Sequence, residues 1–254
     1  MTSSDLSYDG LFAEIERLHW KPWVGERYKL IDGKKLLIVG ESHYCWKNEK
    51  DDPVKVFEDI NKKWFTRKII HESGVCSSTK SKQPILRNIE KVLTNKAALK
   101  KDIQKALWHS VSFYNFIQRP LMSREKQHRP TETDWQNGWH TFYKVIEILK
   151  PDYILFCGVE AVNREFANWN AIKKTEYQYT NKMTKTKNRI GRTFIRSKGS
   201  IQKIDTQLII SCIDHPSSRF SWNKWHRVLN EQMPHYITWL GMQSITNSVE
   251  HFTH

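Results

Sequence analysis

The sequence predicts an α/β protein in which helices flank a doubly wound, mainly parallel central sheet. Three short apolar segments have the Val, Ile and Leu content of strands that are buried on both faces. They are KLLIVG (residues 35–40), YILFC (153–157) and LIISCI (208–213). Segments with helical spacing lie between them, and an alternation of strands and helices is typical of a parallel sheet with crossover helices.

The remaining elements follow from the same patterns. Apolar residues at helical spacing predict helices over residues 11–18, 85–92 and 139–149. The second of these begins after Pro84 and the third is stopped by Pro151. A further apolar run predicts a strand over Trp108–Ile117. Because no internal repeat or linker rich in Gly, Ser or Pro interrupts this order, we expect one domain over residues 1–254.

A basic insertion at about residues 171–207 precedes the last strand. It carries ten Lys and Arg residues against Glu176 and Asp205, so its net charge is 10 − 2 = +8. Its β-prone pieces, TEYQYT and RTFIRS, predict a hairpin. The insertion can be interpreted as a solvated surface loop. Because it holds over half of the net charge of the chain, we favour contacts with phosphate groups.

The charge of the whole chain favours a polyanionic partner. Lys and Arg exceed Asp and Glu by 41 − 27 = 14, and a summed positive field attracts phosphate. No apolar run approaches the roughly 20 residues that span a bilayer, and the first ten residues show no secretion signal. We therefore expect a cytoplasmic monomer that binds DNA and has no membrane partner.

The cysteines give no indication of a metal site. Cys45, Cys76, Cys157 and Cys212 are scattered and include no Cys-x-x-Cys pair. The paired spacing of metal-ligating cysteines is therefore missing, and free thiols are the expected state. We expect neither a metal nor another cofactor.

Five motifs follow one another at the ends of the predicted elements. They are GESHY (40–44), QPILRNI (83–89), SFYN (112–115), KPDYILFCG (150–158) and HPSSRFS (215–221). Their order and spacing resemble those of the uracil-DNA glycosylase superfamily, over roughly Leu36 to Leu229. The resemblance implies a uracil-DNA glycosylase-like fold and a monofunctional DNA glycosylase. Such an enzyme flips a base out of DNA and hydrolyses its N-glycosidic bond.

The resemblance implies that two residues carry the main roles in the reaction. His215 would donate a hydrogen bond to O2 of the pyrimidine as negative charge develops on the departing base. Asn115 would read the Watson–Crick edge of the flipped base with one donor and one acceptor. Both residues also have a structural interpretation, since a histidine can be a core or capping residue and an asparagine can cap a strand end.

The first motif departs from the best-known branch of the superfamily. Ser42 stands in the position of a water-activating Asp, and His43 replaces a Pro. Glu41 is then the one carboxylate of the motif, and it would orient water or stabilise an oxocarbenium-like sugar, unless it only pairs with a surface cation. His43 is a second candidate base. Gly40 belongs to the expected substrate pocket, and Tyr44 would form its wall beside carbon 5 of the base.

Three further loops are expected to contact DNA. Their candidate residues are Gln83, Pro84, Gly158, Ser217, Ser218, Arg219 and Phe220. Arg219 stands where the best-known branch has a leucine that wedges into the base stack, and Phe220 is next to it. An aromatic ring should also stack on the flipped base. Trp46, Phe57 and Trp64 are candidates, and each of them can equally belong to the core.

Two substrates compete under this interpretation. Tyr44 and Asn115 favour uracil from deaminated cytosine, which is a DNA repair role by base excision. The divergent first motif and the basic insertion favour a hypermodified pyrimidine of phage DNA, such as glucosylated hydroxymethylcytosine, which is an anti-phage defence role. A third interpretation is a catalytically inactive DNA-binding module of the same fold, supported by the replacement of the water-activating Asp by Ser42.

Overall fold

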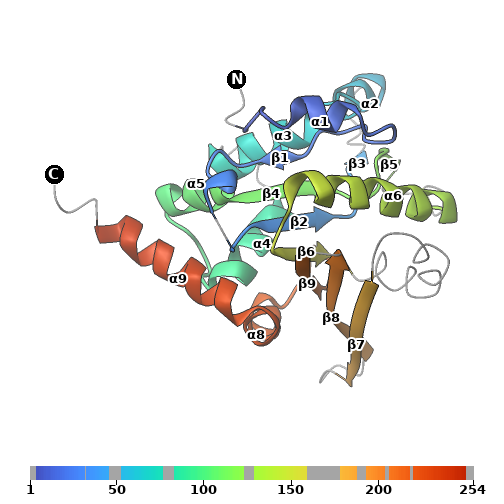
Figure 1. Cartoon of the computed structure of the whole chain (residues 1–254). Coiled ribbons are helices and arrows are strands. Elements are labelled where there is room, and N and C mark those ends of the chain that lie inside the picture. Colours follow the sequence, from blue (N-terminus) through green and yellow to red (C-terminus); the bar gives the residue numbers. More distant parts are fainter. Residues whose placement is uncertain are drawn as a thin grey trace.

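The structure is a computed structural model, and it shows an α/β fold in which helices cover both faces of a sheet (Figure 1). The described residues are 4–31, 33–45, 53–76, 83–122, 129–158, 178–187, 193–203, 206–217 and 220–249. The general α/β class predicted from the sequence is confirmed, with a sheet that is parallel at its centre.

Within the described residues, a seven-stranded sheet has the order β1-β4-β2-β6-β9-β8-β7. The strands are β1 (Trp23–Val24), β2 (Leu36–Gly40), β4 (Val111–Asn115), β6 (Tyr153–Cys157), β7 (Gln178–Lys187), β8 (Thr193–Lys203) and β9 (Thr206–Ile213). Strands β4, β2, β6 and β9 are parallel, whereas β1, β8 and β7 pair antiparallel. Two short parallel strands, β3 (Tyr44–Cys45) and β5 (Leu121–Met122), pair separately.

Helices precede, connect and follow these strands in the described part of the chain. They are α1 (Asp9–Ala13), η1 (Tyr28–Leu30), α2 (Pro53–Ile60), α3 (Phe65–Ile69), η2 (Ile70–Val75), α4 (Pro84–Thr94), α5 (Lys101–Ser110), α6 (Glu132–Leu149), α8 (Trp222–Gln232) and α9 (Pro234–Val249). Of these, η1 is a 3-10 helix and η2 is a π-helix. The predicted helices over residues 85–92 and 139–149 are confirmed within α4 and α6.

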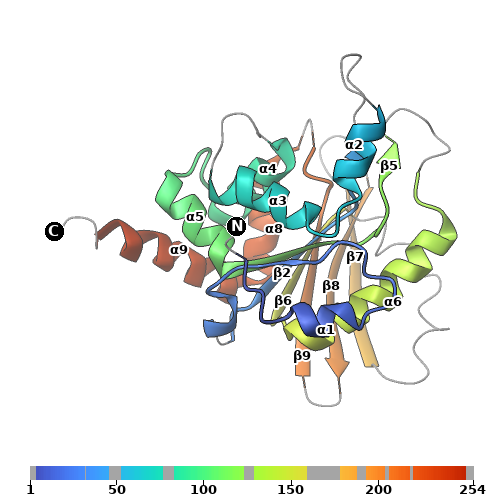
Figure 2. The same ribbon diagram turned by 90° about the horizontal axis from the view of Figure 1, so that it is seen from above.

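Two apolar clusters, one on each face of the sheet, form the core. Helices α1 and α6 pack on one face, where Phe142 meets Val39 and Phe156. Helices α4, α5, α8 and α9 pack on the other face, around Ile38 and Leu155. Figure 2 shows α1 and α6 in front of the strands and α4 and α8 behind them. Because consecutive strand residues point to opposite faces, a strand covered on both sides is mainly apolar along its whole length, which explains the apolar runs of the sequence.

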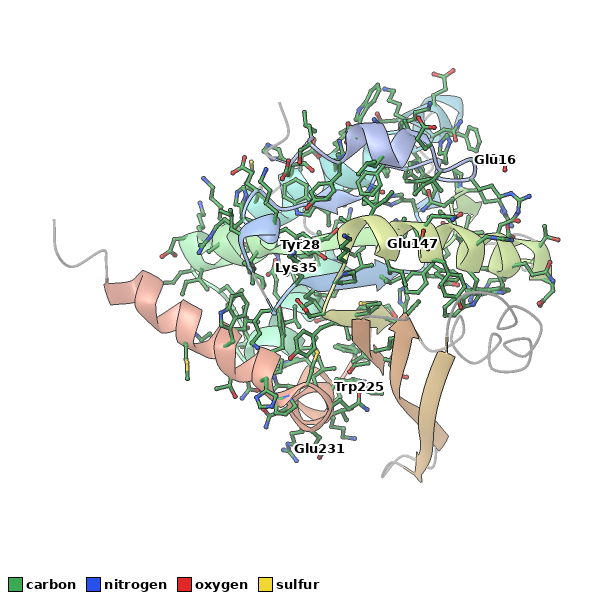
Figure 3. All side chains as sticks on the ribbon, in the orientation of Figure 1. Glu16, Tyr28, Lys35, Glu147, Trp225 and Glu231 are labelled. Atoms are coloured by element: carbon green, nitrogen blue, oxygen red, sulfur yellow. The ribbon has the colours of Figure 1, made fainter. Side chains whose placement is uncertain are left out.

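Helix α8 shows how a helix with many polar residues is fitted to this core. Trp225 lies on the side of α8 that faces the strands and is buried, whereas Glu231 points away from the molecule and is exposed (Figure 3). The indole of Trp225 belongs to the same apolar cluster as Leu155 and Ile213. The helix therefore attaches the segment that follows β9 to the sheet.

The ends of α6 are fixed by local signals. Its N-terminus has a capping box, in which Thr131 Oγ1 accepts a hydrogen bond from Asp134 N at 3.2 Å and Asp134 Oδ2 accepts one from Thr131 N at 2.7 Å. Its C-terminus is Lys150, which has a left-handed conformation with φ of 47° directly before Pro151. Asp134 also accepts two hydrogen bonds from Arg119, at 2.8 and 2.6 Å.

Two sequence predictions are corrected by the structure. The strand predicted over Trp108–Ile117 begins only at Val111, because α5 continues to Ser110. Trp108 is buried on that helix and donates a hydrogen bond from Nε1 to Glu90 Oε1 at 2.8 Å. Three residues, here Trp-His-Ser, are too few to distinguish the last turn of a helix from the start of a strand. The helix predicted over residues 11–18 is shorter and ends at Ala13.

The basic insertion forms the predicted hairpin in its described residues. Strands β7 and β8 pair antiparallel, and β8 joins the edge of the sheet by pairing with β9 through residues 198–203. Residues 193–197 of β8 pair only with β7, so this part of the hairpin extends past Ser211, towards the carboxyl end of β9. The other parts of the insertion, residues 171–177, 188–192 and 204–205, lie outside the described residues.

After the neighbouring strands β2 and β4, the chain crosses to opposite faces of the sheet. The connection after β2 leads to α4 and α5 on one face, and the connection after β4 leads to α6 on the other face. In open α/β sheets, ligands bind at the carboxyl ends of strands where the connections diverge in this way. The GESHY motif and Asn115 lie at this switch point.

Candidate active site

The predicted site residues gather at one edge of the sheet because they end neighbouring parallel strands. Gly40 of β2 is in register with Asn115 of β4. On the other side of β2, β6 ends at Cys157, which is in register with Ile213 of β9. His215 follows two residues later. The motifs that begin at positions 40 and 215 are therefore brought together although 175 residues separate them in the sequence.

Gly40 and Asn115 are in direct contact. Asn115 is buried, with 3% of its surface exposed, and its Oδ1 lies so close to the Gly40 Cα that a Cβ at position 40 would overlap it. The backbone continues this pairing beyond the strands, since Phe116 N donates to Gly40 O at 2.9 Å. The side-chain amide of Gln118 donates to Asn115 O. A glycine at position 40 thus leaves the space in which the carboxamide of Asn115 lies.

Glu41, Tyr44 and Arg129 form a connected cluster next to Gly40. The Tyr44 hydroxyl donates a hydrogen bond to Glu41 Oε2 at 2.9 Å and accepts one from Arg129 Nη1 at 3.1 Å. Arg129 Nη2 lies 3.5 Å from Glu41 Oε1. Burial raises the pKa of Tyr44, and the Glu41 carboxylate raises it further, so the phenol is protonated. We name these three residues the Glu41 cluster.

One oxygen of the Glu41 cluster has no hydrogen-bond donor. Glu41 Oε1 is buried and accepts no hydrogen bond from the described residues, although the Arg129 guanidinium lies within ion-pair distance. A buried carboxylate oxygen without a donor is costly. The oxygen therefore keeps unused acceptor capacity beside Gly40.

His215 is held by the loop that follows β9. Its carbonyl accepts a hydrogen bond from Ser217 N at 2.7 Å, and the Asn88 amide of α4 donates to Pro216 O at 3.2 Å and to Ser217 O at 3.3 Å. Burial lowers the pKa of His215, the Glu41 carboxylate raises it and Arg129 lowers it. The net effect is a lowered pKa, so the imidazole is neutral at pH 7 and still lies within the electrostatic reach of the Glu41 cluster.

Ser42 and His43 belong to the same motif but have other partners. The Ser42 hydroxyl donates to Arg119 O at 2.7 Å. His43 Nε2 shares a hydrogen bond with Thr66 Oγ1 at 2.8 Å, and its ring lies edge-on to Trp20 and Phe65 at 4.7 and 4.8 Å between centroids. Burial lowers the pKa of His43 to about 3. In this arrangement both side chains connect the motif to neighbouring segments of the fold.

The residues expected to contact DNA lie around this edge where they are described. Gln83 precedes α4 and Pro84 is its exposed first residue. Gly158 follows β6 with φ of 129°, a conformation that favours glycine, and has open space around its Cα. Ser217 is partly buried, and Phe220 packs against the apolar cluster under α8. Ser218 and Arg219 lie outside the described residues.

Two of the three candidate stacking rings are described, and both are exposed. Phe57 of α2 is 47% exposed and Trp64, which precedes α3, is 55% exposed. Neither ring belongs to an apolar cluster of the described core. Both rings are accessible to a partner. Trp46 lies outside the described residues.

Sequence reasoning missed Arg129 and Asn88. Arg129 reaches the GESHY motif from 85 residues away, and Asn88 reaches the His215 loop from 128 residues away. Asn88 is part of the QPILRNI motif, whose helical spacing gives a weak indication that it lies beside Ile85, at the border of the apolar face of α4. No local pattern distinguishes Arg129 from the other cations of this basic chain.

The described part of the chain contains neither a membrane-spanning helix nor a metal-binding group. No helix among the described residues is long and apolar enough to cross a membrane. No group of three or more His, Cys, Asp or Glu among these residues is arranged to hold a metal ion.

No family model matches the chain, and no curated protein matches it at a significant level.

Proposed function

We propose that the chain is a monofunctional DNA glycosylase with a uracil-DNA glycosylase-like fold, which flips a modified or damaged pyrimidine and hydrolyses its N-glycosidic bond. The observation that supports this function most is the meeting of Glu41, Asn115 and His215 at the switch point of a parallel sheet. A carboxylate, a carboxamide and a neutral imidazole are the three groups that this reaction needs.

The reaction assigns a different task to each of these groups. The bond between the sugar C1′ and the base nitrogen breaks, and its electron pair leaves with the base. The N–H of neutral His215 hydrogen-bonds O2 and stabilises the anion. Water adds to C1′, and its proton passes to Glu41 Oε1, the buried oxygen without a donor, before it reaches solvent. The base anion then takes up a proton, leaving an abasic site and a free base.

The positive charge of the hairpin provides a surface for the DNA backbone. The described residues of β7 and β8 include three cations each, namely Lys182, Lys185, Lys187, Arg196, Lys198 and Lys203, and no Asp or Glu. The end of the hairpin that extends past the β8–β9 ladder points to the edge where His215 lies. Phosphates that flank a nucleotide flipped at this edge would pass close to the hairpin.

The proposed substrate is a pyrimidine base of DNA, and uracil and hypermodified cytosine are the two candidates. Uracil suits a pocket whose wall is Tyr44, since the ring is tethered by Glu41. Hypermodified cytosine of phage DNA suits the divergent motif, in which Ser42 bonds to Arg119 O and no Asp is present. These alternatives correspond to base-excision repair and to anti-phage defence, and both use the same three groups.

A panel of DNA duplexes and single strands tests the proposal. Each DNA carries uracil, thymine (mismatched with guanine in the duplexes), 5-hydroxymethylcytosine or its glucosylated form, and abasic sites are scored by alkaline cleavage. We expect cleavage with one of these bases, and its loss in the Glu41→Gln and His215→Ala variants. His226→Ala is the matched control, because His226 is a partly buried histidine that bonds to Val92 O at 2.8 Å instead.

The same panel separates the enzyme from an inactive binding module. A protein that binds all of these DNAs and cleaves none of them has kept the fold without the chemistry. That result would replace the glycosylase proposal by the DNA-binding alternative.

A further inference from the structure

Arg129 lies where three segments of the chain meet. It precedes the capping box of α6, and its guanidinium contacts two residues of the GESHY motif. The two groups it contacts are themselves bonded, since the Tyr44 hydroxyl donates to Glu41 Oε2. The guanidinium therefore completes a closed ring of interactions, which restrains the Tyr44 ring and the Glu41 carboxylate together.

The side chains of Arg129 and Glu41 differ in how much of their surface is exposed. The side chain of Arg129 is 54% exposed, whereas that of Glu41 is 15% exposed. An ion pair between two exposed groups contributes little, but here one cation lies over a largely buried carboxylate. The planar guanidinium can reach the phenol oxygen with one nitrogen and the carboxylate with the other, which an ammonium group cannot do in the same geometry.

We propose that Arg129 is a positioning residue that fixes the Tyr44 ring and thereby sets which substituents at carbon 5 of the base are accepted. This inference rests on the proposed glycosylase function. With Arg129 present, Tyr44 is held from two sides and acts as a rigid wall. Without it, the phenol keeps one bond to Glu41, and its ring can turn to admit a larger base.

A second effect of Arg129 does not require any substrate. Its positive charge lowers the pKa of His215, while the Glu41 carboxylate raises it and burial lowers it. Removal of the charge therefore raises the pKa of His215, and replacement by lysine leaves most of this effect in place. The contact with Tyr44 and the charge on His215 can thus be separated by choosing the variant.

The test uses the protein, four single variants and one double variant. Arg129→Gln removes both effects, Arg129→Lys keeps the charge, and Tyr44→Phe removes only the hydroxyl. Arg119→Gln is the matched control, because Arg119 is 41% exposed and pairs with Asp134 at the same end of α6. The measurements are the NMR titration of the His215 imidazole and the ratio of excision from 5-substituted and unsubstituted pyrimidines.

The expected results are specific to Arg129. Arg129→Gln raises the pKa of His215 and increases the excision ratio by up to about tenfold, the scale of one hydrogen bond. Arg129→Lys increases the ratio while the titration of His215 changes little, and Arg119→Gln changes neither. In a Tyr44→Phe background, Arg129→Gln alters the ratio no further, since both changes release the same ring.

Two results would overturn the inference. One is an excision ratio that changes equally in Arg129→Gln and Arg119→Gln. The other is an excision ratio in which the effects of Tyr44→Phe and Arg129→Gln add. If no base is excised by any form of the protein, the glycosylase proposal fails, and the NMR titration still decides whether Arg129 acts on the imidazole.

Discussion

Replacing Gly40 by alanine would place a methyl group against Asn115, the residue proposed to read the base. A Cβ at position 40 would overlap Asn115 Oδ1 and lie 2.9 Å from Phe113 Cζ. Asn115 and Phe113 are both buried in β4, so neither can move away without a shift of the strand. Overpacking of this kind costs about 1–3 kcal/mol. At about 2–4 °C per kcal/mol, the melting temperature should fall by roughly 2–12 °C.

The same variant should lose activity beyond its loss of stability. The Asn115 carboxamide must move by a good part of an ångström, and a misplacement of about 1 Å can reduce a rate by about 10²-fold. Gly74→Ala is the matched control, because Gly74 lies in η2, which carries none of the proposed catalytic groups, and a Cβ there would lie 2.8 Å from Trp108 Cδ1. Both variants are compared by thermal unfolding and by kcat/KM below their melting temperatures.

The comparison can contradict the reasoning in two ways. Unchanged stability in Gly40→Ala would show that the Asn115 side chain is not packed against position 40. Equal losses of kcat/KM in Gly40→Ala and Gly74→Ala would show that activity follows global stability and not the position of Asn115.

Three further predictions concern the imidazoles and the hairpin. His215→Ala should reduce turnover by about 10²–10³-fold, the scale for a preorganised donor to a developing anion, with little change in DNA affinity by fluorescence anisotropy; a parallel loss of affinity would make His215 structural. His43 has a folded-state pKa of about 3 against about 6.5 when unfolded. Its contribution to the free energy of unfolding is therefore complete above pH 6.5 and lost as the pH falls towards 3. His43→Leu should flatten this part of the pH–stability curve measured by denaturant unfolding, and a curve of unchanged slope would contradict it. DNA affinity should fall steeply with salt, and Lys185→Gln with Lys187→Gln should reduce the slope of log K against log salt by about one unit per lost phosphate contact; an unaltered slope would remove the hairpin from the interface.

The strands of the central sheet could be predicted because their environment is simple. The predicted strand over 153–157 has the same bounds as β6, and the one over 208–213 lies within β9. Both contribute apolar side chains to the clusters on the two faces of the sheet, so the apolar run itself marks the element, even though Ser211 interrupts the second one. The segment 108–110 was assigned wrongly because α5 runs directly into β4, and three residues at such a junction carry no period of their own.

The sequence by itself determined which residues end the strands, and in a parallel sheet those ends share one edge. Gly40 and Asn115 end neighbouring strands of this kind, and His215 follows the end of a third. Only the tertiary structure decided how these residues are held. Arg129 reaches Glu41 and Tyr44 across a gap in the sequence that local periodicity does not span, because side-chain pairing between distant segments depends on the packing of α6 against the sheet and leaves no periodic trace along the chain.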